Sequence, residues 1–165
     1  LPDTFGEPYP DAARSGEVEQ IEVDLNQTLD RVQSLGSAPY ELPRMKLKQA
    51  RRIVSVGRQV GNIEVAKSLA QAIGAELAGA RESIDEGYID EDHVIGITGE
   101  RVAPDLYIAL GIRGDTQHSF GMQDARYVVA VHPDPDAPML KQADAAIVDD
   151  PAKVANELMK LMSNH

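Results

Sequence analysis

The residues best suited to bind a ligand follow a short apolar run at 106–112. Two glycines there, Gly111 and Gly114, have the spacing GxxG. Four polar residues come directly after them: Asp115, Thr116, Gln117 and His118. An apolar strand, a glycine turn and the polar start of a helix are typical of a site where backbone approaches a ligand closely. Free N–H groups at a helix start favour an anion, such as pyrophosphate or a reduced ring carbonyl.

GxxG alone is not specific, but further polar side chains come directly after other apolar runs. They are Arg58, Arg81, Thr98, His132 and Asp150. An arginine at such a position can hold a phosphate, and a fixed cation near a redox ring stabilises the ring's anionic form. Each residue also has a simpler explanation: a surface arginine, a turn threonine, a structural histidine, or an aspartate that caps a helix. Their shared position at the ends of predicted strands favours a common site.

Several familiar motifs are absent from the sequence. It has no Cys, and its four His, at positions 93, 118, 132 and 165, lack metal-ligand spacing such as HxxxH. It also lacks the nucleophile elbow GxSxG, the Walker pattern GxxxxGK[ST] and the dinucleotide fingerprint GxGxxG. These absences argue against a serine hydrolase, a metal site and an ordinary nicotinamide-binding unit.

Charge and composition exclude two further classes of partner. The formal net charge is −11 and aromatic residues make up 4% of the chain, which argues against nucleic-acid binding. The same charge suits a protein that docks onto basic partner surfaces. No apolar run approaches the roughly 20 residues of a membrane span, so we expect no direct membrane insertion.

The elements that must position these residues alternate along the chain. Apolar runs predict strands at 53–56, 76–80, 106–112, 127–131 and 145–148, and a strand with a turn at 94–99. Apolar spacing and polar starts predict helices at 66–73, 117–124 and 139–142. Asp150 and Pro151 predict the start of a last helix, with Val154, Leu158 and Leu161 on its inner face. This alternation predicts an α/β fold with a doubly wound parallel sheet, in which ligands bind beyond the carboxyl ends of the strands.

The N-terminal part of the chain lacks this alternation of predicted strands and helices. Residues 1–18 are rich in Pro, Gly and acidic residues and predict no regular structure, and 20–25 alternate as a half-buried strand would. We interpret 1–50 as an extended arm and linker and 51–165 as the binding domain. Because the first residue is Leu1, we expect more polypeptide upstream in the parent protein, although a processed N-terminus would look the same.

Residues 51–163 resemble the C-terminal FAD-binding domain of the electron-transfer flavoprotein α subunit. The block that carries the resemblance is VAPDLYIALGIRGDTQHSFGMQD, at 102–124, against a family pattern close to VAPxLYIAxGISGxxQHxxGMxxS. The segments at 81–87, 97–99 and 134–138 fit the family in the same order, and 14–19 resemble the stretch between its two domains. The chain thus looks like an α subunit without its N-terminal domain.

The resemblance implies a Rossmann-like domain that binds FAD. By position, Arg58 would contact the cofactor, Arg81 would lie over the flavin ring and favour its negatively charged form, and Thr98 would bond near N5. Gly114, Gln117 and His118 would hold the pyrophosphate and the pyrimidine carbonyl side, and Asp150 would reach the adenosine end. The expected cofactor-binding set is completed by Gly99, Arg113, Asp115, Thr116 and His132.

The sequence departs from the family near the expected ring. The family usually has Ser at Ala80, Gln at Ile97, Ser at Arg113 and Asn at His132, and its first loop reads GGRG where this chain has VGRQ. Ala80 and Ile97 remove hydrogen bonds, whereas Arg113 adds a positive charge. These changes suggest a divergent branch whose flavin potential, partner or nucleotide differs.

The implied function is that of an electron carrier rather than a substrate-transforming enzyme, with no catalytic residues. Its partners would be an electron-transfer flavoprotein β subunit in a heterodimer, flavoprotein dehydrogenases as donors, and a quinone reductase as acceptor. It would work in the cytoplasm or, less favoured, the mitochondrial matrix. The alternative is a subunit that holds AMP or structural FAD without redox activity. A hydrolase has little support, because no nucleophile–base set is present.

Overall fold

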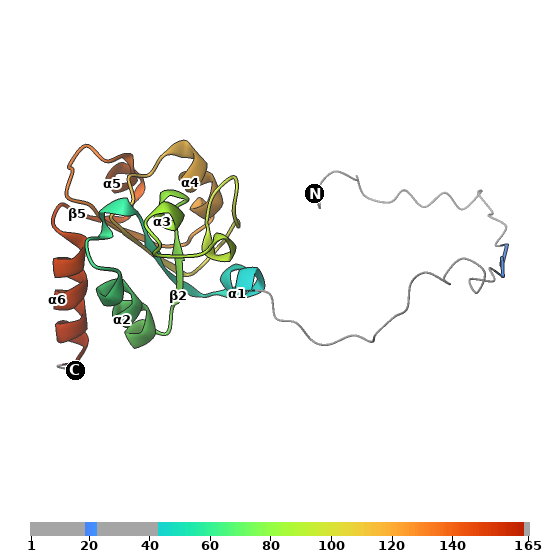
Figure 1. Cartoon of the computed structure of the whole chain (residues 1–165), viewed down its shortest axis with the longest axis horizontal. Coiled ribbons are helices and arrows are strands. Elements are labelled where there is room, and N and C mark those ends of the chain that lie inside the picture. Colours follow the sequence, from blue (N-terminus) through green and yellow to red (C-terminus); the bar gives the residue numbers. More distant parts are fainter. Residues whose placement is uncertain (1–18, 23–42, 164–165) are drawn as a thin grey trace. The chain divides into compact units, whose positions relative to one another are not determined.

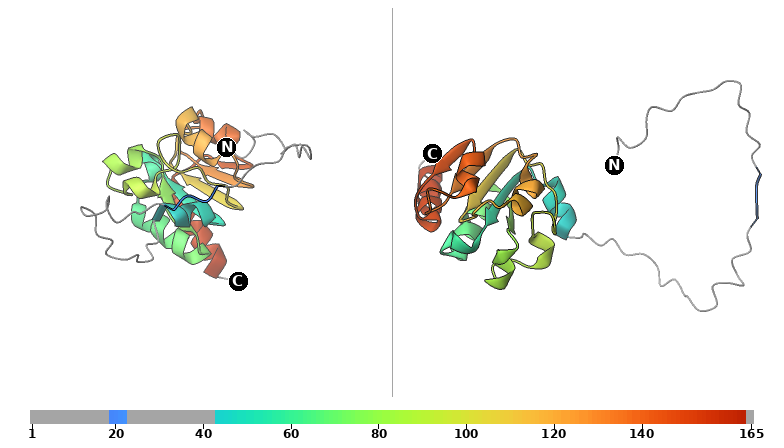
Figure 2. Two further views of the ribbon diagram at one scale, coloured as in Figure 1. Left: turned by 90° about the vertical axis from the view of Figure 1, so that its right-hand side faces the viewer. Right: turned by 90° about the horizontal axis from the view of Figure 1, so that it is seen from above.

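The computed structural model of the chain describes residues 19–22 and 43–163. The chain divides into two units between Pro39 and Tyr40. In the first unit only 19–22 are described, and they are irregular, so the predicted strand at 20–25 is wrong for 20–22 and lies outside the described residues for the rest. All elements below belong to the second unit, shown in Figures 1 and 2.

The second unit is built on a five-stranded sheet in which every strand pair is parallel. Its order is β2-β1-β3-β4-β5, and the strands are β1 Arg52–Val56, β2 Glu76–Gly79, β3 Leu106–Leu110, β4 Val128–Val131 and β5 Ala145–Ile147. The central strand β3 thus pairs with β1 on one side and β4 on the other. The predicted α/β class and parallel sheet are confirmed.

Helices cover both faces of the sheet, which explains why the strands are apolar throughout. On one face, α2 (Ile63–Ile73) and α6 (Pro151–Ser163) pack on Val54, Ile108 and Leu110. On the other, α1 (Pro43–Gln49), α4 (Thr116–Met122) and α5 (Pro138–Gln142) contribute to a core that contains Ile53 and Tyr107. Short elements complete the unit: η3 Arg58–Val60, α3 Glu82–Asp85 and η4 Glu91–His93.

The helix ends follow the sequence signals. Gly74 has φ 61° and ψ 44°, the left-handed conformation expected just past α2. The Lys153 N–H donates to Asp150 Oδ1 at 2.8 Å, so Asp150 caps α6 and Pro151 occupies its first position. Among the described residues no helix is long and apolar enough to cross a bilayer.

Three predicted features differ from the structure. Residues 43–49, expected to be linker, form α1, whose Leu47 is 1% exposed in the core. The segment at 94–99 forms isolated bridges at Val94 and Ile95 and then a turn, rather than a regular strand. Leu161 is 63% exposed, so the inner face of α6 ends at Leu158 and Met159. The division into an arm at 1–50 and a domain at 51–165 stays a prediction.

Candidate functional site

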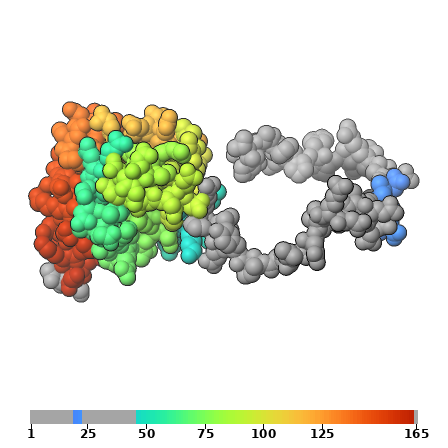
Figure 3. Space-filling view, viewed as in Figure 1, coloured from blue at the N-terminus to red at the C-terminus, as the bar shows by residue number. Residues whose placement is uncertain are grey.

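The loops that follow the strands carry two adjoining hollows. The first hollow is lined by Arg81, Glu82, Ile95, Gly96, Ile97, Thr98, Ile112, Gly114, Asp115, Gln117 and His118. The second hollow is lined by Arg58, Gln59, Glu82, Gly111, Arg113, Asp115 and His132. Because Glu82 and Asp115 line both hollows, the two hollows form one continuous candidate site at the carboxyl edge of the sheet. Figure 3 shows the segment around 81–98 beside the loop that follows β1 on one face of the molecule.

Most of the predicted site residues meet in these hollows, but three do not line them: Gly99, Thr116 and Asp150. Gly99 closes the turn that begins at Gly96, its N–H donating to the Gly96 carbonyl at 3.1 Å. Asp150 caps α6, the simpler of the two roles that the sequence allowed. Binding roles for these three residues stay predictions.

The GxxG turn requires glycine at both of its ends. Gly111 has φ +68°, and a Cβ there would clash with the backbone of Gln59 in the loop after β1. Gly114 has φ +89°, and a Cβ there would run into Met139 at the start of α5, whose N–H donates to the Arg113 carbonyl at 2.9 Å. The turn therefore locks together the loops after β1 and β3 and the start of α5.

Three arginines reach the candidate site, and two of them are paired with acids. Arg58 Nε lies 3.2 Å from Glu86 Oε1, and Arg113 Nη1 lies 3.2 Å from Asp134 Oδ2. Arg81, just past β2, makes no side-chain hydrogen bond or ion pair with any other described residue. It is the cation most available to an anionic ligand.

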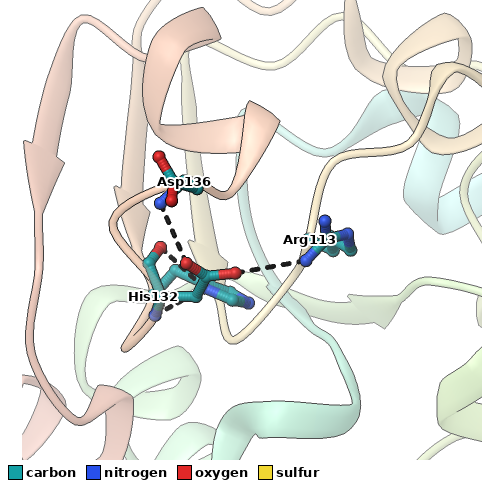
Figure 4. A network of polar contacts seen from close by, with 4 residues as sticks. Arg113, His132 and Asp136 are labelled. Atoms are coloured by element: carbon teal, nitrogen blue, oxygen red, sulfur yellow. Dashed lines mark hydrogen bonds and ion pairs between the residues drawn. The ribbon is translucent and has the colours of Figure 1, made fainter.

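Asp134 organises the turn after β4, which Figure 4 shows from close by. Its carboxylate accepts from the Asp136 N–H at 2.9 Å and from Arg113 at 3.2 Å, and these contacts lower the pKa of Asp134. Its own N–H donates to His132 Nδ1 at 3.1 Å. The same Nδ1 lies 3.2 Å from the Asp134 carbonyl oxygen, so it donates to that oxygen in one tautomer and accepts from the Asp134 N–H in the other. His132 is 1% exposed and lines the second hollow.

Both ring nitrogens of His118 contact groups inside the protein. Its Nε2 lies 2.8 Å from the Tyr107 hydroxyl and its Nδ1 lies 3.1 Å from the Ile95 carbonyl oxygen. Burial lowers the pKa of His118 to about 4, partly offset by the Ile95 carbonyl and Asp115. The ring is thus neutral at pH 7, and both its nitrogens are used inside the protein. His118 lines the first hollow, and its expected contact with the cofactor stays a prediction.

Backbone contacts join the two loops of the first hollow. The Ile97 N–H donates to the Gln117 carbonyl at 2.9 Å, which places Thr98 and Gln117 on the same hollow. Ala80 is 1% exposed, and Ile97 is 57% exposed on the rim. Neither offers a side-chain hydrogen bond there.

Sequence reasoning left seven lining residues out of the site: Gln59, Glu82, Ile95, Gly96, Ile97, Gly111 and Ile112. Gly111 belonged to the GxxG pattern, so it had a signal. Glu82 follows Arg81 directly after a strand, the position used to select the arginine. Because Glu82 and Asp115 border both hollows, the site carries acidic as well as basic groups.

A larger hollow of about 770 Å³ lies at the opposite edge, where the strands begin. It is lined by Arg51, Arg52, Gly74, Asp105, Leu106, Arg126 and Tyr127. Asp105 pairs with Arg51 at 2.7 Å, and Arg52 donates to the Ile73 carbonyl at 2.7 Å. These arginines therefore have structural partners, and ligands of parallel α/β sheets bind at the other edge. The described residues hold no cluster of His, Asp and Glu suited to a metal ion at either edge.

Comparison with known proteins identifies the domain that carries the candidate site. Residues 46–123 match the family model described as the electron transfer flavoprotein FAD-binding domain. These residues belong to that domain family. The chain is 38% identical over 153 residues to the electron transfer flavoprotein subunit alpha of Thermoanaerobacterium thermosaccharolyticum, which covers 91% of this chain and 46% of that protein.

Two further relatives agree with this assignment. The protein FixB of Clostridium saccharobutylicum is 37% identical, over 86% of this chain and 43% of that protein. The electron transfer flavoprotein subunit alpha of Paracoccus denitrificans is 41% identical, over 72% of this chain and 39% of that protein. The chain thus spans less than half the length of these curated relatives. The family model covers both hollows up to Asp115, Gln117 and His118, whereas His132 lies beyond it.

The matched domain is an FAD-binding domain, which supports FAD as the cofactor. The residues present fit such a ligand. Two adjoining hollows suit an elongated molecule, and Arg81, which has no side-chain partner among the described residues, suits an anionic group. Thr98 and Gln117 add exposed polar groups to the first hollow.

Proposed function

We propose that this chain is the FAD-binding part of an electron-transfer flavoprotein. It takes electrons from flavoprotein dehydrogenases and passes them to a quinone reductase or another acceptor, in a heterodimer with a β subunit and in the cytoplasm. The observation that supports this most is the pair of adjoining hollows at the carboxyl edge of the sheet, which gather Arg58, Arg81, Thr98, Gln117 and His132 within a chain similar to electron transfer flavoprotein α subunits.

In this proposal the chain is a redox carrier and not a catalyst of substrate chemistry. When bound, FAD supplies the ring that accepts and releases electrons. The chain holds and tunes it: Arg81 provides a positive charge, and Thr98 and Gln117 provide hydrogen-bonding groups in the first hollow. Arg58, Arg113 and His132 take the more distant parts of the dinucleotide in the second hollow. Gly99, Thr116 and Asp150 are proposed to contact it from neighbouring positions.

A second candidate function is a nucleotide-binding subunit that holds AMP or structural FAD without redox activity. It is favoured by one observation: where the family usually has hydrogen-bonding side chains, the buried Ala80 and the rim residue Ile97 have none. A ring bound there would receive fewer hydrogen bonds from this chain. The remaining polar groups, Arg81 and Thr98 above all, favour the carrier.

The assembled heterodimer separates the two functions. We would co-express the chain with its β subunit, identify the bound nucleotide by mass and record the visible spectrum during reduction. A yellow colour that bleaches on reduction supports the carrier. Bound AMP, or a flavin that cannot be reduced and reoxidised, contradicts it and supports the alternative.

The role of Arg81 has a separate test. We expect Arg81→Ala to lower the potential for the first electron by roughly 30–60 mV, because about 1 kcal/mol of charge stabilisation is lost. The matched control is Arg126→Ala, the same charge change at the opposite edge of the sheet. Equal potentials in the wild type and Arg81→Ala would refute the assigned role.

A further inference from the structure

A series of hydrogen-bonded, buried polar groups lies directly beneath the first hollow. Tyr107, on β3, is 0% exposed and its hydroxyl lies 2.8 Å from His118 Nε2. His118, on α4, is 6% exposed and its Nδ1 lies 3.1 Å from the Ile95 carbonyl oxygen. This series of hydrogen-bonded groups thus connects the middle of the sheet to both loops that line the first hollow. Neither hollow is lined by Tyr107 itself.

The direction of these hydrogen bonds follows from the groups involved. A carbonyl oxygen can only accept, so His118 Nδ1 carries the proton that it shares with Ile95. In a neutral ring Nε2 is then an acceptor, and the Tyr107 hydroxyl must donate to it. Burial disfavours the charged forms of both side chains: it lowers the pKa of His118 and raises the pKa of Tyr107. The Ile95 carbonyl therefore selects one of the two tautomers of the imidazole, and the Tyr107 hydroxyl supplies the donor that this tautomer needs at Nε2.

The two ends of this series of hydrogen-bonded groups lie in the segments that line the first hollow. Ile95 leads directly into the turn that carries Thr98, and His118 follows Gln117 at the start of α4. The same segments are joined a second time, by the Ile97 N–H and the Gln117 carbonyl at 2.9 Å. With His118 in its observed tautomer, the turn and the helix are held together at two points. In the other tautomer the Nδ1 bond to Ile95 is lost, because two acceptors then face each other.

We propose that Tyr107 is a positioning residue of the candidate site, whose hydroxyl donates to His118 Nε2, holds the ring with its Nδ1–H on the Ile95 carbonyl and thereby fixes the loops that carry Thr98 and Gln117. This rests on the function proposed above and names a residue that acts on the same site from within the core. A tyrosine that merely fills the core would stabilise the fold equally, but its hydroxyl would not hold the His118 ring in place.

The test is Tyr107→Phe, which removes one buried oxygen and keeps the ring. Its matched control is Tyr127→Phe, the same change at an exposed tyrosine that lines the hollow at the opposite edge. The first measurement, by nitrogen NMR of the full chain at pH 7, is the tautomer of His118 and the chemical shift of its Nε2. We expect the Nδ1–H form in all three proteins, because the Ile95 carbonyl still accepts from Nδ1. In Tyr107→Phe we expect the Nε2 signal to move, because Nε2 loses its hydrogen-bond donor, whereas Tyr127→Phe should leave it unchanged.

Two further measurements ask whether this hydrogen bond matters to the site. Hydrogen exchange of the Ile97 amide reports the contact between the loops, and we expect it to be about tenfold faster in Tyr107→Phe. The Gly111 amide, bonded to the Val131 carbonyl at 2.9 Å, should be unchanged. In the assembled heterodimer we expect Tyr107→Phe to bind FAD about five- to tenfold more weakly, as the loss of one buried hydrogen bond implies.

The outcomes are distinct. An Nε2–H tautomer in the wild type overturns the proposal even if Tyr107→Phe does not fold. An unchanged Nε2 signal in Tyr107→Phe overturns it too, and so does a shifted Nε2 signal with unchanged Ile97 exchange and unchanged FAD affinity. If the wild-type heterodimer binds no FAD, the proposed function fails, and the Nε2 signal and the exchange rate still decide whether Tyr107 positions the loops.

Discussion

The buried His118 predicts a specific loss of stability in mild acid. An unfolded histidine takes up a proton near pH 6.5, whereas burial lowers the pKa of His118 in the folded protein to about 4. Between these values the unfolded state binds more protons than the folded state, so the free energy of unfolding falls as the pH falls. Above about pH 6.5 both states are neutral at this residue and its contribution to the pH dependence vanishes.

The magnitude follows from the size of the shift. A difference of about 2.5 pKa units between the folded and unfolded states corresponds to about 3 kcal/mol at pH 4 and about 2 kcal/mol at pH 5, relative to pH 7. This is a large share of the roughly 5–15 kcal/mol that stabilises a typical domain. Acid should therefore weaken this fold well before most of its carboxylates are protonated.

The assay is urea unfolding at pH 7, 6, 5 and 4.5, for the wild type and for His118→Gln. Glutamine is a suitable control because its amide can still accept from Tyr107 and donate to the Ile95 carbonyl, but it cannot be protonated. Carboxylates and other histidines act equally in both proteins, so the difference isolates His118. If that difference stays constant from pH 7 to pH 5, His118 is not buried and neutral as described.

Three further substitutions test other parts of the structure. Ser55→Ala should change the free energy of unfolding by less than ~1 kcal/mol, because the buried Ser55 hydroxyl has no well-aligned hydrogen bond among the described residues and lies near the Tyr107 phenol; a loss above ~1.5 kcal/mol in urea unfolding would show that it bonds to Tyr107. Gly111→Ala should cost at least ~2 kcal/mol, from its φ of +68° and its contact with Gln59, and a fully stable variant would contradict this tight turn. Asp150→Ala should lower the free energy of unfolding by ~1 kcal/mol through loss of the α6 cap; an unchanged thermal midpoint would count against it.

The sheet was predictable because its signals are local. Each central strand is a run of apolar residues bounded by glycine or a polar residue, and each is covered on both faces in the structure. Gly74 and Asp150 marked helix ends through their own backbone and side-chain preferences. Because parallel strands share a carboxyl edge, the order of the elements alone was enough to bring Arg81, Thr98 and His132 to one side of the sheet.

The features that were missed depend on long-range packing. Residues 43–49 were expected to be linker, but Pro43 is the first residue of α1, where its missing N–H costs nothing. Leu161 continues the periodic stripe of α6, but no described element covers the last turn of that helix. The bond between Tyr107 and His118 joins a strand to a helix, and neither residue's neighbours in sequence announce it. The sequence alone therefore did not predict which side chains from different elements contact each other.

The charges of the candidate site also look different once these partners are known. From the sequence alone, Arg58, Arg81 and His118 were all expected to contact the cofactor. In the structure Arg58 is paired with Glu86, and His118 is neutral at pH 7. Arg113, the charge that departs from the family pattern, is paired with Asp134. Among the described residues that line the hollows, Arg81 is thus the cation without a carboxylate partner. The preference of this site for negative charge therefore depends mainly on Arg81, and an anion in the second hollow must compete with Glu86 and Asp134 for the other two arginines.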